Sequence, residues 1–273
     1  MTSNASFRDL HAGPGAFVMP NPWDVGSARM LAAMGFDALA TTSAGMAFSM
    51  GLREGQADRA AVLNHCHEIV GATDLPVSAD LEYGFGHTPE SAAETIQAAA
   101  ETELAGCSLE DHTGDPANPI YDFNHAVDRI AAASEAARAL PGDFVVTARA
   151  EALLWGCTDI DDIIRRLQAF EAAGADVLYA PGLHDLGVIQ TVCSSVSKPV
   201  NVVMGLPGAT FTIAELADAG VRRISVGAAL ARIAFGAFID AAREIKDYGS
   251  FTYSDKAMGF AEIEALLPKP AGH

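Results

Sequence analysis

Residues Pro76–Gly86 read PVSADLEYGFG, a short apolar strand that ends in two carboxylates and a glycine-aromatic-glycine turn. Side chains two positions apart on a strand point the same way, so we expect Asp80 and Glu82 to face one point. A second acidic strand end follows at Ser108–Asp111. Carboxylate oxygens gathered at neighbouring strand ends suit a hard divalent cation such as Mg²⁺. Strand-end acids can also cap a helix or stay solvated, but the two stretches together favour a metal site.

Segments with strand character recur along the whole chain. They are short, apolar and rich in valine, as strands that are buried on both faces should be. The expected strands are Ala16–Pro20, Ala38–Thr42, Val77–Asp80, Cys107–Glu110, Phe144–Ala148, Val177–Ala180, Val200–Val203 and Arg223–Val226.

Alanine-rich segments with helical periodicity lie between these strands. Several of them stop at a glycine just before the next strand, as at Gly35, Gly106 and Gly174, which is typical of helix C-termini. The clearest helical segments are Gly26–Met34, Arg59–Val70, Pro89–Ala105, Ala126–Ala139, Asp159–Ala172 and Ala228–Ile245.

Eight strands that are each followed by a helix predict an α/β fold, a (β/α)₈ barrel over residues 1–246. The competing open, doubly wound sheet would carry Gly-x-Gly-x-x-Gly after its first strand, and this chain does not. Residues 247–273 are distinct. A polar stretch, Asp247–Asp255, precedes an amphipathic run, Met258–Leu266, which we expect to be an extra helix docked on its own barrel or on a neighbour.

Composition limits the partners. The 273 residues are 50% hydrophobic, with no apolar run long enough to span a bilayer and no signal peptide, and the four cysteines are scattered. These features predict a cytoplasmic protein with reduced thiols. The net charge of −18 would repel nucleic acid and anionic membranes. An anionic substrate would therefore need a bound cation and placed arginines.

The active site of such a barrel lies at the carboxyl ends of its strands. Arg149 is the one cation at these strand ends, and we expect it to clamp a carboxylate or a phosphonate. Backbone N–H groups of Ser43, Ala44 and Gly45 could hold the other end of an anion. His112 follows the second acidic strand and is either a general acid or base or a solvated loop residue.

Seven stretches, in this order, carry a family resemblance: Asn21–Arg29 (NPWDVGSAR), Thr41–Gly45 (TTSAG), Gly51–Glu54 (GLRE), Ala79–Gly86 (ADLEYGFG), Leu109–His112 (LEDH), Ala148–Ala152 (ARAEA) and residues from Asn201 to Gly227. On these motifs the chain resembles the isocitrate lyase/phosphoenolpyruvate mutase superfamily. The resemblance implies a (β/α)₈ barrel that is usually tetrameric, with the last helix exchanged between paired subunits. It also implies Mg²⁺, with Mn²⁺ as a substitute, and a bound 2-oxo acid or its enolate.

The resemblance also assigns roles to individual residues. Asp80 matches the direct metal ligand, and Glu82 and Glu110 match acids that hold metal-bound water. Glu54 stands where members usually carry an aspartate that reaches the metal shell, a departure from the pattern. Ser43 and Ala44 match the backbone cradle for the substrate anion, Arg149 matches the substrate arginine, and Asn201 is a further substrate-binding candidate.

The loop after Glu110 departs from the family. Isocitrate and methylisocitrate lyases carry a Lys-(Lys/Arg)-Cys-Gly-His loop here, whose cysteine protonates the leaving enolate. This chain instead reads HTGDPANPIY over His112–Tyr121, which we expect to be a mobile lid. Within it, Asn118 could take the place of an asparagine in the lid of the mutases. The strand-five ARAEA motif is also closer to the mutases, in a bacterial subset similar to carboxyvinyl-carboxyphosphonate phosphorylmutase.

The resemblance therefore implies a Mg²⁺-dependent lyase, hydrolase or mutase that acts on a C–C or C–P bond next to a 2-oxo acid enolate. Its substrate would be a small anion similar to oxaloacetate or phosphonopyruvate, and the protein would be a homodimer or homotetramer. A weak or inactive 2-oxo acid binder on the same fold is an alternative. A 2-alkylmalate lyase is disfavoured by the missing cysteine loop.

Overall fold

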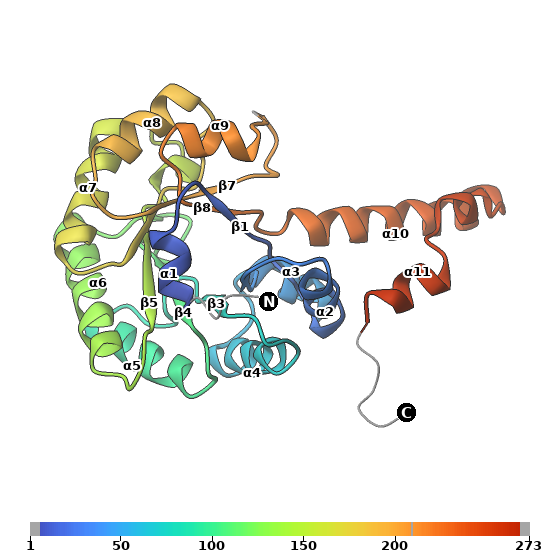
Figure 1. The fold of residues 1–273 in the computed structure, drawn as a ribbon, viewed down its shortest axis with the longest axis horizontal. Coiled ribbons are helices and arrows are strands. Elements are labelled where there is room, and N and C mark those ends of the chain that lie inside the picture. Colours follow the sequence, from blue (N-terminus) through green and yellow to red (C-terminus); the bar gives the residue numbers. More distant parts are fainter. Residues whose placement is uncertain (1–5, 209, 268–273) are drawn as a thin grey trace.

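The computed structural model describes residues 6–208 and 210–267, and Figure 1 shows a ring of strands enclosed by helices. The eight strands pair in parallel in the order β1-β8-β7-β6-β5-β4-β3-β2. At the remaining seam the backbone N–H of Ala40 donates to the carbonyl of Pro20 at 3.0 Å, so the barrel is nearly closed. The strands are β1 (Phe17–Met19), β2 (Leu39–Ala40), β3 (Val77–Asp80), β4 (Gly106–Glu110), β5 (Val145–Arg149), β6 (Val177–Tyr179), β7 (Val200–Val203) and β8 (Arg223–Ser225).

All eight predicted strands are confirmed, with small changes at their ends. The second strand was expected to reach Thr42, but Thr42 instead caps the following helix, where its hydroxyl accepts a hydrogen bond from the N–H of Gly45. The predicted helix Pro89–Ala105 ends at Ala100, and Glu103 then takes a left-handed backbone with φ 62°.

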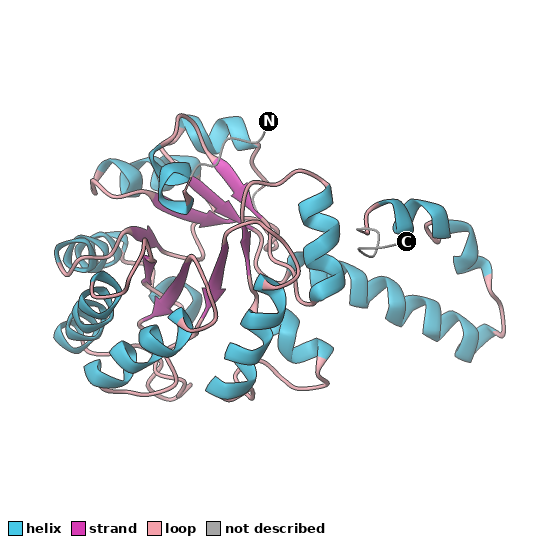
Figure 2. Cartoon of the chain, turned by 60° about the horizontal axis from the view of Figure 1, so that its bottom comes forward, coloured by secondary structure: helices cyan, strands magenta, loops and turns pink. Residues whose placement is uncertain are grey.

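The helices cover the outside of the strands (Figure 2). Their N-termini are capped mostly by aspartate and threonine, as by Asp24 at the start of α2. They are α1 (Phe7–Ala12), α2 (Val25–Ala33), α3 (Ser43–Ser49), α4 (Arg59–Val70), α5 (Pro89–Ala100), α6 (Phe123–Arg138), η1 (Ala152–Trp155), α7 (Ile160–Ala172), α8 (Leu186–Ser194), α9 (Ile213–Asp218), α10 (Ala229–Tyr248), η2 (Thr252–Lys256) and α11 (Phe260–Ala265).

Helix α1 lies at the amino-terminal end of the strands. Its Phe7 is buried in a cluster with the first residues of β5 and β6, Val145 and Val177. The buried His11 makes edge-to-face contacts with both Phe7 and Phe17. Helix α1 therefore closes this end of the barrel and leaves the opposite end open.

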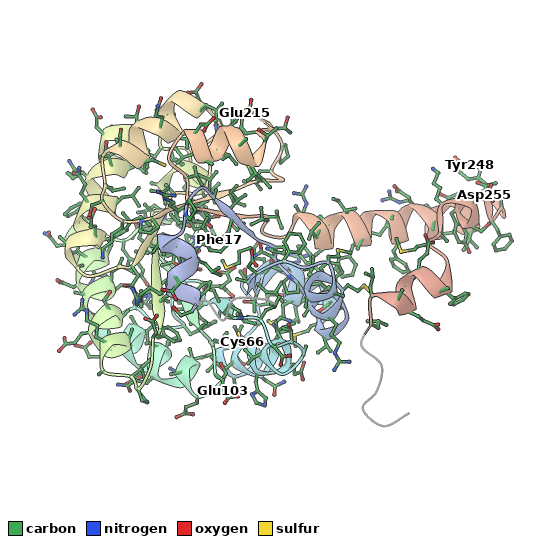
Figure 3. All side chains as sticks on the ribbon, in the orientation of Figure 1. Phe17, Cys66, Glu103, Glu215, Tyr248 and Asp255 are labelled. Carbon is green, nitrogen blue, oxygen red and sulfur yellow. The ribbon has the colours of Figure 1, made fainter. Side chains whose placement is uncertain are left out.

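A helical arm leaves the barrel after β8 (Figures 1 and 2). Helix α10 runs across the predicted boundary at residue 246 and ends at Gly249, whose φ of 63° stops it. Figure 3 places Tyr248 and Asp255 at the outer end of the arm. The predicted final helix forms as α11, but η2 occupies much of the stretch that was expected to be turn-like. None of the helices that the structure describes has both the length and the apolar character needed to cross a membrane.

Candidate active site

A cavity of about 330 Å³ opens at the carboxyl ends of the strands. Ligand pockets in proteins span roughly 300–1,000 Å³, so this one suits a small molecule. Six of the predicted site residues line it, namely Ser43, Ala44, Glu54, Asp80, Arg149 and Asn201. The other five, Gly45, Glu82, Glu110, His112 and Asn118, are not among its lining residues.

Asp80, the last residue of β3, is held at the cavity from three sides. Its backbone N–H donates to the Thr41 hydroxyl at 2.9 Å. Its Oδ2 accepts a hydrogen bond from the Ser43 hydroxyl at 2.8 Å, and its Oδ1 accepts one from Arg149 at 3.0 Å. These contacts fix the carboxylate orientation at the strand end, where the sequence places it.

Arg149 ends β5 and is surrounded by carboxylates. It contacts Glu151 at 2.7 Å, Asp80 at 3.0 Å and Glu110 at 3.2 Å, and it lies over the Tyr179 ring. Burial alone would lower the pKa of Arg149, but the three carboxylates outweigh that effect and raise it. The guanidinium therefore stays charged and organises the acids. The contact with Glu151 orients the Arg149 side chain.

Glu82 reaches the acidic cluster by a different route from the one predicted. β3 ends at Asp80, and Glu82 has a left-handed backbone with φ 49°, so strand alternation does not align the two side chains. A backbone hydrogen bond from the N–H of Glu110 to the carbonyl of Glu82, at 3.0 Å, joins this turn to the end of β4 instead. The turn thus begins before the glycines to which the sequence assigned it.

Crowding of acids perturbs this cluster. Burial, followed by repulsion from Asp80 and Glu110, raises the pKa of Glu82 to about 8. The same causes raise the pKa of Glu54. Carboxylates that repel one another in this way would be stabilised by a divalent cation with oxygen ligands.

The carboxylate oxygens of this cluster are the kind of ligand that a hard metal ion prefers. In the conformation described for residues 6–208 and 210–267, no three His, Cys, Asp or Glu side chains converge tightly enough to hold a metal by themselves. Asp80 faces Arg149 and Ser43 instead. The residues that would hold a metal are therefore Asp80 and the glutamates around it, with water completing the shell.

The backbone cradle is partly used within the protein. The N–H of Ser43 points to Asp80 at 3.3 Å, and that of Gly45 donates to the Thr42 hydroxyl at 3.2 Å. A Cβ on Gly45 would lie 2.6 Å from Thr42 Cγ2, so close packing rather than ligand binding explains this glycine. Ser43 and Ala44 remain the cradle residues that face the cavity.

The loop after β4 is folded against itself. His112 and Ile120 form an antiparallel bridge, and the Thr113 hydroxyl donates to the carbonyl of Asn118 at 2.6 Å. Residues 114–118 are exposed at its tip, Asn118 among them. The predicted lid therefore has internal structure of its own.

His112 stacks on Trp155 with ring centroids 4.8 Å apart. Its Nδ1 lies 3.7 Å from Glu110, which raises the pKa of the imidazole against the opposing effect of burial. The Nε2 atom is buried, and no residue in the described part of the chain bonds to it. This atom could move a proton if the loop shifted toward the cavity.

Asn201 lies at the floor of the cavity, where its amide is occupied. Its Nδ2 donates to the Ser225 hydroxyl at 3.0 Å and its Oδ1 accepts from Arg223 at 2.8 Å. Arg223 also donates to the Thr147 hydroxyl at 3.0 Å and lies 3.3 Å from His11 Nε2. Burial lowers the pKa of Arg223 to about 9.

Arg149 stands at the end of β5, as the sequence indicates, but other cations also reach the cavity. Arg223 and Arg232 also line it. Neither was expected from the carboxyl ends of the strands, because Arg223 begins its strand and Arg232 lies in the first turn of α10. A search of the first helical turn after each strand would have found Arg232.

Comparisons with known proteins identify the family of the chain. The family model for phosphoenolpyruvate phosphomutase matches residues 7–246. A crystal structure from Burkholderia cenocepacia J2315, described as a lyase/mutase, shares 54% identity with a TM-score of 0.92, over 95% of this chain and 93% of that one.

Two curated relatives are more distant. “Probable 2-methylisocitrate lyase 2” of Corynebacterium glutamicum is 30% identical over 96% of this chain and 87% of its own length. The oxaloacetate decarboxylase of Paraburkholderia xenovorans is 29% identical over 66% of this chain and 60% of its own length. Enzymes of this group generally depend on a divalent metal. The chain is therefore an enzyme of the isocitrate lyase/phosphoenolpyruvate mutase superfamily, and its (β/α)₈ barrel agrees with that assignment.

Proposed function

We propose that this enzyme is a Mg²⁺-dependent lyase that cleaves the C3–C4 bond of a small 2-oxo dicarboxylate, by decarboxylation of an oxaloacetate-type substrate. The observation that carries this proposal is the set of groups around the cavity. Its lining contains no cysteine, histidine or lysine among the described residues. A reaction whose leaving group needs no proton from the enzyme fits such a site.

Loss of carbon dioxide is that kind of reaction. The bond between C3 and the C4 carboxylate breaks, and its electron pair moves into the enolate at C2 and C3. Carbon dioxide leaves without being protonated, and C3 later takes a proton from water. When bound, Mg²⁺ would supply Lewis-acid stabilisation of the developing enolate.

The chain's own residues position the substrate. Ser43 and Ala44 present backbone and hydroxyl groups at one wall, and Arg149 holds Asp80 in place at the other. Glu54 lines the same cavity, where burial and neighbouring acids raise its pKa. The name of the Paraburkholderia xenovorans relative supports decarboxylation, although this chain spans only 60% of its length.

C–P bond chemistry on a phosphonopyruvate-like substrate is a second candidate. The match to the phosphoenolpyruvate phosphomutase model favours it, as does the Arg149–Glu151 pair of the ARAEA motif. Homo-oligomerisation and Mg²⁺, with Mn²⁺ as a substitute, form part of the same proposal.

A substrate screen tests the proposal. Purified enzyme would be incubated with oxaloacetate, 2-alkylmalates and phosphonopyruvate, with Mg²⁺ and with EDTA. We expect Mg²⁺-dependent formation of pyruvate and carbon dioxide from oxaloacetate. Release of phosphate or phosphoenolpyruvate from phosphonopyruvate alone would favour the second candidate, and no turnover of any compound would leave a non-catalytic binder.

Replacing Arg149 with lysine should weaken catalysis by about tenfold or more, on the order of 1.4 kcal/mol. A lysine keeps the charge but cannot hold Asp80, Glu110 and Glu151 at once, as the planar guanidinium does. The measurement is kcat/KM for oxaloacetate. Arg165→Lys, at an exposed arginine that pairs only with Asp162, is the control. Wild-type kinetics in Arg149→Lys would contradict the role.

A further inference from the structure

The cavity has two differently charged zones. Arg149 forms ion pairs with three carboxylates. Their negative charge more than neutralises the guanidinium, so Arg149 attracts a further anionic group only weakly. Arg223 lies deeper and is only 2% exposed, held by Asn201 and Thr147. Neither arginine is free to bind the far end of a dianion.

Arg232 differs from both. It lines the cavity, its side chain is exposed, and nothing in the described ranges forms an ion pair or side-chain hydrogen bond with it. Three apolar residues that also line the cavity are partly exposed, Phe48 (40%), Leu154 (50%) and Leu206 (41%). Among the described residues, Arg232 is thus a cation without an ion-pair partner in a cavity that apolar side chains also line.

The position of Arg232 is fixed by packing. It is the fourth residue of α10, which starts four residues after β8 ends. The preceding residue, Ala231, is fully buried, and its Cβ would lie 3.2 Å from a Cβ on Gly45 of α3. One turn on, Phe235 packs against Trp23 and Phe48. The first turns of α10 therefore pack against α3, and this packing fixes the backbone position of Arg232.

We propose that Arg232 binds the distal carboxylate of a 2-oxo dicarboxylate and so selects dianionic over monoanionic 2-oxo acids. This inference rests on the proposed function, because it concerns the substrate of the same cavity. A guanidinium can pair with a carboxylate through two parallel hydrogen bonds. In a chain of charge −18, an exposed cation without an ion-pair partner also attracts the anion.

Two compounds of nearly the same shape separate charge recognition from general damage. Oxaloacetate and 2-oxobutyrate differ only in a carboxylate or a methyl group at C4. Initial rates with oxaloacetate and Mg²⁺ give KM and kcat, and 2-oxobutyrate is titrated as a competitive inhibitor. The variants are Arg232→Met, Arg232→Lys and a matched control, Arg243→Met, which removes an exposed arginine that pairs only with Asp240 further along α10.

We expect Arg232→Met to raise KM for oxaloacetate by about tenfold, which corresponds to about 1.4 kcal/mol, with little change in kcat. The inhibition constant of 2-oxobutyrate should stay within about twofold of wild type, because that ligand has no distal carboxylate to lose. Arg232→Lys should recover part of the loss, and Arg243→Met should match wild type.

Failure can be assigned unambiguously. If wild-type enzyme shows no Mg²⁺-dependent turnover of oxaloacetate, the proposed function falls and this inference falls with it. If wild type is active but Arg232→Met leaves KM unchanged, or weakens both compounds equally, only the inference is overturned.

Discussion

Replacing Asp80 with asparagine should lower Mg²⁺-dependent turnover by at least about 100-fold. Residues one step removed from a metal already change affinity or activity by about 10–100-fold, and the proposed direct ligand should cost more. Asparagine keeps the shape of the side chain and the contact with Ser43, but it removes the charge that Mg²⁺ and Arg149 require. The fold should persist, since Arg149 retains Glu110 and Glu151.

Two measurements check this expectation. Calorimetric titration with Mg²⁺ reports metal affinity directly, and thermal unfolding reports the fold. Asp240→Asn, at a carboxylate that is exposed on α10, is the matched control and should behave as wild type. Unchanged Mg²⁺ affinity in a folded Asp80→Asn enzyme would remove Asp80 from the metal site.

Truncation after Asp247 should break the assembly. The residues that the truncation removes carry large exposed apolar side chains, including Phe251 (62%), Met258 (60%) and Phe260 (88%), next to Phe238 (69%) on the retained part of α10. Exposed apolar surface of this extent marks an interaction site, and we propose that a second copy of the chain covers it, within a dimer or a tetramer built from two dimers. Loss of α11 and η2 should therefore give smaller or insoluble species, because folding and association are linked in such oligomers.

Light scattering on the purified protein measures the mass. A gentler variant, Phe238→Asp, should dissociate the oligomer without shortening the chain, whereas Arg243→Glu on the same helix should not change it. A truncated protein that stays soluble at wild-type mass would show that residues beyond Asp247 do not hold the subunits together.

Local patterns predicted the barrel well. Valine-rich strands buried on both faces differ clearly from alanine-rich amphipathic helices, and a helix stop before a strand marks the boundary. The exact ends of the strands and helices were harder to predict. Thr42 has good strand propensity, yet its hydroxyl caps α3, and tertiary position decides between these uses.

The site was predicted in part for a similar reason. Asp80 and Arg149 follow from motifs at strand ends, Glu54 follows from the family resemblance, and all three line the cavity. Glu82 illustrates the limit, because a left-handed residue at that point is not encoded by the period-two pattern. Arg232 was missed because it lies in the first turn of α10 and not at a strand end, where the cations were sought.

The packing of helix α1 against the amino-terminal end of the barrel has a practical consequence. Arg223 touches both the cavity floor, through Asn201, and the N-terminal helix, through His11. A change that displaces α1, such as an affinity tag fused close to Phe7, would remove the contact between His11 and the buried guanidinium of Arg223. Preparations tagged at opposite termini should therefore be compared before kinetic constants are assigned to the enzyme, because a tag at the N-terminus can perturb the floor on which the substrate rests.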